Sequence, residues 1–256
     1  MIQMPHIAVI GGGLLGLSCA DSLMRRGAKI TIYEKKMNVG RGAAEFNSGM
    51  IHPSQTAPWL VDYEIDNFRA VYDLALKSRG LLRSRQKSLG LDTDRRESGT
   101  LQLFDSRYLG ERARAQYESR NIQADLYRGE WNFGRYCLKF PNDMSGDASV
   151  YMNALKQDLI SQGCNIVTGQ KIETIKEINS EVDAIIIACG ADSDLFLELP
   201  VRAEPGHALI FPVPDIALPK MPIMHAHSHS ALTTFPNHIR LSGTLNEDSP
   251  DALLEI

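Results

Sequence analysis

Three glycines near the start of the sequence have a spacing that suits the binding of phosphates. Residues 7–20 read IAVIGGGLLGLSCA, in which Gly11, Gly13 and Gly16 fit the pattern G-x-G-x-x-G. In this pattern the first glycine makes a tight turn, the second lets the backbone approach a pyrophosphate, and the third lets a helix pack closely on a sheet. The N-terminus of that helix adds unpaired N–H groups and a favourable dipole. The glycines therefore predict a dinucleotide site, with a purely structural turn as the alternative.

An acidic residue follows at the distance that such a site requires. Glu34 lies 23 residues after Gly11, at the end of a second apolar segment. A carboxylate in this place can accept hydrogen bonds from an adenosine ribose, and its charge repels a 2′-phosphate. Together, the glycines and Glu34 exclude NADP more firmly than they distinguish FAD from NAD.

Hydrophobic spacing predicts the elements that position these groups. We expect a strand over 6–10, a helix over 14–26 that Gly27 ends, and a second strand over 29–34. The next stretch, 38–59, is rich in small residues, and its backbone could reach an extended dinucleotide. An ordinary surface loop is the alternative for that stretch.

Further elements are expected along the rest of the chain. The apolar run at 184–188 is typical of a strand buried on both faces. The other expected helices are 63–89, 108–120 and 148–162, and the other expected strands are 99–104, 165–168, 207–213, 231–235 and 238–244.

Composition narrows the class of protein. Lys and Arg total 27 against 31 Asp and Glu, so the formal net charge is -4 and no cationic field favours nucleic acid. No apolar run approaches the ~20 residues of a membrane span, and we expect a cytoplasmic protein without a secretory signal. The cysteines Cys19, Cys137, Cys164 and Cys189 form no metal-binding pair, and we expect Cys19 and Cys189 to be buried thiols.

The N-terminal quarter of the chain resembles a known family. Residues 6–59 are similar to the start of the FAD-dependent amine and amino-acid oxidoreductases of the D-amino-acid oxidase superfamily, and most similar to bacterial D-amino-acid dehydrogenases. The resemblance rests on Asn47-Ser48-Gly49-Met50-Ile51-His52-Pro53 and on Pro58-Trp59. Residues 98–104, 138–147, 184–196 and 238–247 resemble later stretches of the same dehydrogenases.

The resemblance implies an α/β fold with two domains and FAD as cofactor. A Rossmann-like FAD-binding domain would comprise 1–58 and 143–200, and a mainly antiparallel α+β substrate domain 59–142 and 201–256. The implied reaction moves hydride from the α-carbon of an amino acid or amine to flavin N5. The resulting imino acid hydrolyses to a keto acid and ammonia, and the electrons pass to a quinone or another acceptor. Glycine, sarcosine, proline and opines stay open as substrates, and no catalytic side chain is assigned.

The resemblance also implies which residues contact FAD. They belong to the glycine turn, the end of the second strand, the small-residue stretch and the end of the 184–188 strand. The predicted cofactor-binding residues are Gly11, Gly13, Leu14, Leu15, Gly16, Glu34, Lys35, Arg41, Ala43, Ala44, Asn47, Ser48, Gly49, Met50, Ile172, Ala188, Cys189 and Gly190.

Three histidines raise the question of a metal site. On a strand, His225, His227 and His229 would share one face, and imidazoles suit zinc or copper. Adjacent residues on one strand face diverge, however, and no carboxylate or cysteine is close in sequence. A polar wall of the substrate cavity or a solvated edge strand is the favoured interpretation, and no metal is expected.

Near its C-terminal end, this sequence departs from the pattern of the family. Chains of the family continue past the part that resembles 238–247, and there they supply an Arg for the substrate carboxylate and a glycine-rich segment for the flavin. This sequence stops at Ile256, and Arg240 matches a structural position rather than that Arg. We therefore expect the isolated chain to have little or no dehydrogenase activity and to bind FAD loosely. A non-catalytic or incomplete FAD-binding subunit that needs a partner is the alternative function, and peripheral contact with the inner membrane stays open.

Overall fold

The computed structural model divides the chain into two compact units. Unit 1 comprises Met1–Phe46 and Ala148–Ala203, and unit 2 comprises Asn47–Asp147 and Glu204–Ile256. The residues that the structure describes are 4–55, 68–91, 95–132, 134–178, 181–199, 201, 203, 206–215, 217–228 and 230–243. Pro58-Trp59, the expected start of the helix at 63–67 and His229 lie outside them. The expected division into FAD-binding and substrate domains concerns binding, and it stays a prediction.

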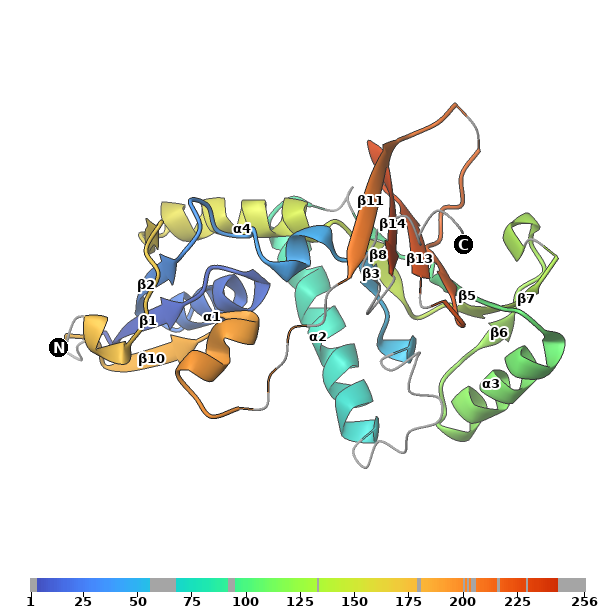
Figure 1. Cartoon of the computed structure of the whole chain (residues 1–256), viewed down its shortest axis with the longest axis horizontal. Coiled ribbons are helices and arrows are strands. Elements are labelled where there is room, and N and C mark those ends of the chain that lie inside the picture. The colour runs from blue at the N-terminus through green and yellow to red at the C-terminus, as the bar shows by residue number, and fades with distance from the viewer. Residues whose placement is uncertain are drawn as a thin grey trace. The chain divides into compact units, whose positions relative to one another are not determined.

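Unit 1 is built on a parallel four-stranded sheet with the order β10-β1-β2-β9. Its strands are β1 (His6–Ile10), β2 (Lys29–Glu34), β9 (Asn165–Thr168) and β10 (Ala184–Ile187). β1, from the blue end of the colour range, pairs with the orange β10 from the second half of the chain (Figure 1). Helices α1 (Leu14–Met24) and α4 (Ala148–Ser161) pack against each other. Because all four strands are parallel, their carboxyl ends meet at one edge of the sheet.

The first strand–helix–strand segment forms as its sequence predicts. Gly13 is the N-cap of α1, and Leu17 and Ala20 are fully buried on its inner face. The helix ends before Gly27, which has φ +88°, a conformation that residues with a Cβ rarely adopt. Short 3-10 helices follow elsewhere in unit 1: η1 (Ala43–Phe46), η5 (Ile175–Glu177) and η6 (Gly190–Leu195).

Two expectations about burial in unit 1 are wrong. β10 is not buried on both faces: Ala184 is exposed and the other three residues are half-buried, because β10 lies at the edge of the sheet. Cys19 and Cys189 are only half-buried, since Cys19 lies beside the buried stripe of α1 and Cys189 opens the loop after β10. The buried thiols are Cys137 and Cys164, and burial raises the pKa of Cys137 to about 12.

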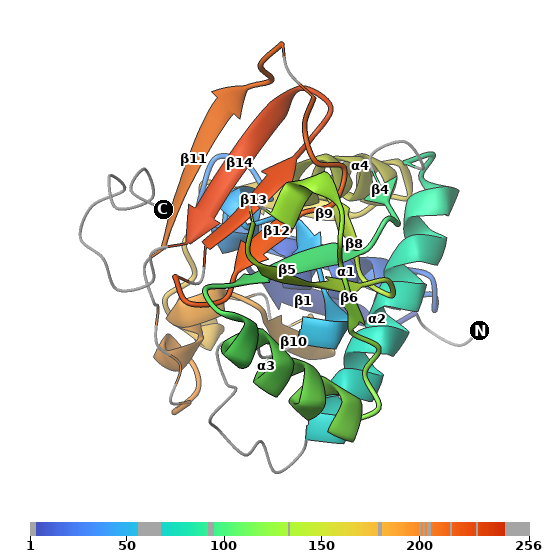
Figure 2. The ribbon, with the colours of Figure 1, turned by 90° about the vertical axis from the view of Figure 1, so that its right-hand side faces the viewer.

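Unit 2 contains a seven-stranded sheet with the order β11-β14-β13-β12-β5-β7-β6 (Figure 2). All neighbouring pairs are antiparallel except β12 with β5. Its strands are β5 (Thr100–Phe104), β6 (Asp125–Leu126), β7 (Tyr136–Phe140), β11 (His207–Pro212), β12 (Ile223–His225), β13 (Ser230–Thr234) and β14 (His238–Gly243).

A smaller sheet and two long helices complete unit 2. β8 (Met144–Gly146) lies between β3 (Met50–Ile51) and β4 (Arg95–Arg96), and it is antiparallel to both. Among the described residues of unit 2, the long helices are α2 (Phe68–Ser88) and α3 (Arg107–Ser119), and the 3-10 helices are η2 (Pro53–Gln55) and η4 (Glu130–Asn132). Together the two units confirm the expected α/β class with a parallel sheet and a mainly antiparallel second part.

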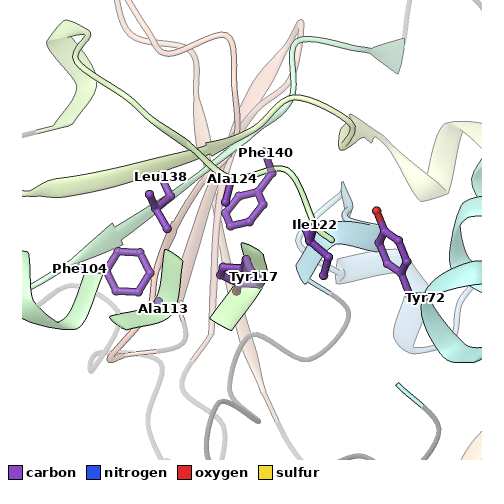
Figure 3. Close-up of a cluster of buried hydrophobic side chains, with 8 residues drawn as sticks. All are labelled: Tyr72, Phe104, Ala113, Tyr117, Ile122, Ala124, Leu138 and Phe140. Atoms are coloured by element: carbon purple, nitrogen blue, oxygen red, sulfur yellow. The ribbon is translucent and has the colours of Figure 1, made fainter. Parts of the chain in front are cut away.

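A cluster of buried hydrophobic side chains in unit 2 lies between helices α2 and α3 and strands β5 and β7. Tyr117 of α3 meets Phe140 edge to face, with 4.9 Å between ring centroids (Figure 3). The Tyr117 hydroxyl donates a hydrogen bond to Gln102 Oε1 at 3.1 Å, and burial raises the pKa of this phenol. Across the described part of the chain, no helix is long and apolar enough to cross a membrane.

Candidate cofactor-binding site

A cavity of about 440 Å³ lies at the carboxyl edge of the unit 1 sheet, and we call it the edge cavity. Residues that follow each of the four parallel strands contribute to it, which is where ligands of open α/β sheets bind. Its lining residues are Ile10, Gly11, Gly13, Leu14, Leu15, Tyr33, Glu34, Lys35, Lys36, Gly42, Ala43, Ala44, Gln170, Lys171, Ile172, Ala188, Cys189, Gly190, Ala191, Asp192, Leu195 and Phe196.

The three glycines of the motif have different surroundings. A Cβ on Gly11, which has φ +104°, would lie 2.4 Å from the Ala188 carbonyl oxygen. A Cβ on Gly16 would lie 1.9 Å from the Gly11 carbonyl oxygen, so this glycine lets α1 approach the turn. A Cβ on Gly13 would meet no atom within 4 Å. The first and third glycines are therefore required by the fold, whereas the second leaves open space at the start of α1.

Glu34 fixes the shape of the turn as well as lining the cavity. Its Oε2 accepts a hydrogen bond from Gly12 N at 2.8 Å, and its Oε1 accepts one from Lys36 N at 2.8 Å. The Gly12 carbonyl in turn accepts a bond from Gly40 N at 2.7 Å. Each carboxylate oxygen has a second lone pair. The buried Glu34 can thus hold the turn and still accept a ligand hydroxyl.

An ion pair joins two parts of the cavity lining. Lys35, after β2, donates a hydrogen bond from Nζ to Asp192 Oδ2 in η6, after β10. This bond raises the pKa of the Lys35 ammonium above its ordinary value. Both side chains are partly exposed, so the pair is worth little in stability by itself.

Arg41, which is also predicted to bind the cofactor, lines a second cavity of about 500 Å³ in the same unit. This cavity shares Lys36, Gly42 and Ala43 with the edge cavity, so the two adjoin. Arg41 pairs with the buried Glu45 of η1, and the Arg41 carbonyl accepts a hydrogen bond from Lys36 Nζ. Glu45 offsets the charge of Arg41, so Lys36 supplies the net positive charge beside the cavity, which suits an anionic ligand.

The predicted residues Asn47, Ser48, Gly49 and Met50 belong to unit 2, not to the lining of either cavity. They form a turn that bonds to itself: Asn47 Oδ1 accepts from Gly49 N at 3.0 Å, and Ser48 Oγ accepts from Met50 N at 3.3 Å. Gly49 has φ +72°, and a Cβ there would lie 2.4 Å from Phe235 Cζ. The turn is therefore closely seated within unit 2, and its contact with FAD stays a prediction.

Most of the predicted residues do gather in space. Of the eighteen, thirteen line the edge cavity or its neighbour, and Gly16 packs directly behind the turn. Sequence reasoning missed several lining residues that no local pattern singles out: Gln170, Lys171, Asp192 and Phe196. It also missed Gly12, the middle one of three consecutive glycines, whose N–H donates to Glu34.

The histidine segment does not form one continuous strand. β12 ends at His225, and residues 226–228 form a turn, so His225 and His227 do not share a strand face. His225 Nε2 lies 3.0 Å from Asp105 Oδ1, and Arg135 Nη1 donates to the same oxygen at 2.8 Å. Among the residues described, no three His, Cys, Asp or Glu side chains are grouped as metal ligands.

A protein-family model and a curated relative both indicate a family of FAD-dependent oxidoreductases. The sequence pattern of the DAO family, described as FAD dependent oxidoreductase, matches residues 6–255. A D-amino acid dehydrogenase from Methylobacterium radiotolerans is 24% identical over 322 aligned residues, which cover 93% of this chain and 75% of the relative. Because the aligned length exceeds the 256 residues of this chain, the relative contains stretches that this chain lacks.

Solved structures share the fold. Glycine oxidase from Bacillus cereus superposes with a TM-score of 0.78 at 19% identity, covering 98% of this chain and 76% of the oxidase. Iminodiacetate oxidase from Chelativorans sp. BNC1 superposes with a TM-score of 0.75 at 18% identity, covering 95% of this chain and 72% of that one.

Proposed function

Because this chain belongs to the DAO family of FAD-dependent oxidoreductases, we propose that its edge cavity binds the ADP half of FAD and that the protein oxidises an amino acid or amine. The observation that carries the proposal is the open space at Gly13, at the start of α1 and beside the buried carboxylate of Glu34. When bound, FAD supplies the acceptor for the two electrons removed from the α-carbon of the substrate.

The residues around the cavity fit a pyrophosphate with an attached ribose. No side chain caps the N-terminus of α1, so the N–H groups of its first turn can bind phosphate oxygens. Each carboxylate oxygen of Glu34 has a lone pair that no backbone N–H uses, and this lone pair can accept a hydrogen bond from a ribose hydroxyl. The negative charge of Glu34 disfavours the extra phosphate of NADP. Ile172, which has only 4% of its surface exposed, provides an apolar wall for the adenine.

The cofactor assignment is tested on the purified protein. We expect the visible absorbance of an oxidised flavin, and we expect FAD, not FMN, to be released on denaturation. Added FAD should compete with ADP for one site, whereas NADP should not displace either. Protein that binds NADP as tightly as FAD would overturn the assignment.

The substrate assignment rests on the relatives and is tested by turnover. The named relative is a D-amino acid dehydrogenase, and the structural neighbours include a glycine oxidase. We therefore propose D-amino acids and small glycine-like amines as substrates. The assay follows an artificial electron acceptor with a panel of D-amino acids, their L-enantiomers, glycine and sarcosine. Faster turnover of L- than of D-amino acids would contradict the D-specific assignment.

A second function is favoured by the alignment length. The relative contains stretches that this chain lacks, and such stretches could carry substrate contacts. The alternative is an FAD-binding subunit that is catalytically incomplete by itself. It predicts loose FAD binding without turnover of any substrate in the panel, and tighter binding with turnover only when a partner protein is added.

A further inference from the structure

The ion pair between Lys35 and Asp192 joins segments that follow two non-adjacent strands of the unit 1 sheet. Lys35 comes directly after β2, and Asp192 lies in η6, after β10. Strand β1, which leads into the glycine turn, lies between β2 and β10 (Figure 1). Both side chains line the edge cavity, and Lys35 Nζ donates to Asp192 Oδ2. The pair is therefore part of the proposed nucleotide site and lies within one unit.

The element that carries Asp192 is anchored at both ends. Asp192 N donates to the Cys189 carbonyl at 3.3 Å, which ties the residue to the end of β10. After η6, Phe196 packs against a buried cluster of unit 1 that contains Ile172 and Ile178. The Asp192 carboxylate thus has a defined place, and the flexible four-carbon stem of Lys35 reaches it.

Lys35 is also the neighbour of the carboxylate that we assign to the ribose. Glu34 is bonded to Gly12 N and Lys36 N, which holds its side chain against the glycine turn. The ammonium of Lys35 is a compact charge on a mobile stem, and lysine is a frequent partner of phosphate groups. A Lys35 side chain without a carboxylate partner could therefore turn to a phosphate on the ribose beside Glu34. Asp192 engages it instead.

A second lysine of the cavity lining is paired in a different place. Lys171 follows β9, and its Nζ donates to Glu173 Oε1 at 3.1 Å. Glu173 itself is outside the cavity lining, and both side chains of this pair are mostly exposed. The Lys171–Glu173 pair has the same chemistry as the Lys35–Asp192 pair, but its lysine does not follow Glu34 along the chain. It offers a matched control.

We propose that Asp192 is a specificity-determining residue of the edge cavity: by holding Lys35, it makes the site accept an adenosine ribose with a free 2′-hydroxyl and reject a 2′-phosphate. This inference rests on the proposed nucleotide function. While Asp192 neutralises Lys35, the negative charge of Glu34 acts on the ribose without compensation. Without Asp192, the freed ammonium offsets that charge and supplies a partner for the phosphate.

The test compares two ligands that differ only in the 2′-phosphate, ADP and 2′-phospho-ADP. In wild type, the dissociation constant of 2′-phospho-ADP should exceed that of ADP. Asp192→Asn keeps the shape of the side chain and removes its charge. We expect it to lower the ratio of the two dissociation constants by about fivefold, the size of one partly exposed ion pair, with the dissociation constant of ADP unchanged. Because the gain is electrostatic, about 0.5 M salt should remove most of it.

Two controls assign the gain to Lys35. Glu173→Gln removes the same charge from the pair at Lys171 and should leave the ratio unchanged. Lys35→Met combined with Asp192→Asn should lose the gain, because the freed cation is then absent. Isothermal titration calorimetry measures both ligands on every variant, and melting temperatures confirm that each variant is folded. Should Asp192→Asn not fold, Asp192→Ala removes the same charge and carries the same expectation.

The results separate this inference from the function on which it rests. Wild-type protein that binds no ADP would overturn both. Wild type that binds ADP, together with an unchanged ratio in Asp192→Asn, would overturn the inference and leave the proposed function standing. An equal fall of the ratio in Glu173→Gln would show an effect of net charge alone, and a fall that persists without Lys35 would show a different partner. Either of these results would also overturn the inference.

Discussion

At the scale of single residues, Gly13 and Gly16 differ in what an added side chain would meet. We expect Gly13→Asp to fold normally, because a Cβ there meets no atom within 4 Å and Asp is a good N-cap for α1. The same variant should lose FAD, because its carboxylate lies where the phosphates would bind. Gly16→Ala should instead lower the melting temperature of the ligand-free protein, since its Cβ would lie 1.9 Å from the Gly11 carbonyl oxygen. Melting curves and FAD content separate the two effects, and equal FAD content in Gly13→Asp and wild type would contradict the site.

Glu34 carries a second prediction at this scale. Glu34→Ala should weaken FAD binding by roughly 1–3 kcal/mol, because it removes a charged acceptor for the ribose and releases Gly12 N. Glu177→Ala is the matched control, since Glu177 Oε1 also accepts a backbone bond in unit 1, from Thr174 N at 2.7 Å, but lies outside the cavity lining. Titration followed by flavin fluorescence measures both. Equal affinities of the Glu34 and Glu177 variants would place the ribose contact elsewhere.

At the scale of elements, local sequence patterns predicted the bounds of helices and strands where these bounds depend on neighbouring residues of the chain. The expected helix at 148–162 is observed at Ala148–Ser161, and the expected strand at 165–168 is observed with those bounds. A positive φ at Gly163 separates them, which the glycine alone predicts. The glycine motif of unit 1 is similarly contained within one strand, one turn and one helix.

The remaining features depend on contacts between residues far apart in the sequence. An apolar run cannot tell whether β10 is a central or an edge strand, since that depends on which strand joins β1. Asp192 enters the cavity lining only because η6 brings it to Lys35, which is 157 positions away. The segment at His225 turns because β12 pairs back onto β13 at Ser230, and alternating residues look the same in a longer strand.

Asp143 connects elements of unit 2 and carries a prediction on pH. This carboxyl, 2% exposed, accepts hydrogen bonds from Ser54 N in η2 and from the Thr100 hydroxyl in β5. Burial nevertheless raises its pKa above 3.8. The folded protein thus binds a proton that the unfolded chain has lost, and this contribution to stability is present at low pH and lost as the pH rises through the raised pKa.

The comparison of Asp143→Asn with wild type isolates this contribution. The free energy of unfolding of wild type, relative to Asp143→Asn, should fall as the pH rises from about 4 towards 7, because only wild type must ionise the buried group. Denaturant titrations at several pH values measure the difference. A difference that rises with pH would mean that the hydrogen bonds from Ser54 and Thr100 outweigh burial and lower the pKa.

At the scale of the whole molecule, each unit is made from separate stretches of the chain. The chain passes between the units at Phe46–Asn47, at Asp147–Ala148 and again at Ala203–Glu204. The family could be predicted from the sequence because the stretches that carry the resemblance, such as residues 47–53, are short continuous runs. The structure clusters Asn47 onward with unit 2, where Met50 pairs with β8 and the Asn47 carbonyl bonds to Arg240 of β14. The predicted contact of residues 47–50 with FAD stays a prediction.

These crossings predict that the two units unfold together. Trp131 belongs to unit 2, so in a Trp59→Phe variant the tryptophan fluorescence reports the unfolding of that unit alone. ADP binds unit 1 in our proposal, and a ligand at 100 times its dissociation constant stabilises the folded state that binds it by about 2.7 kcal/mol. If the units unfold as one, saturating ADP should raise the denaturant midpoint of the tryptophan signal as much as that of the far-ultraviolet circular dichroism of the whole chain. Gly13→Asp, which should not bind ADP, is the control and should show no shift. A tryptophan midpoint that ADP leaves in place, while the circular dichroism splits into two transitions, would show instead that unit 2 unfolds independently of the nucleotide site.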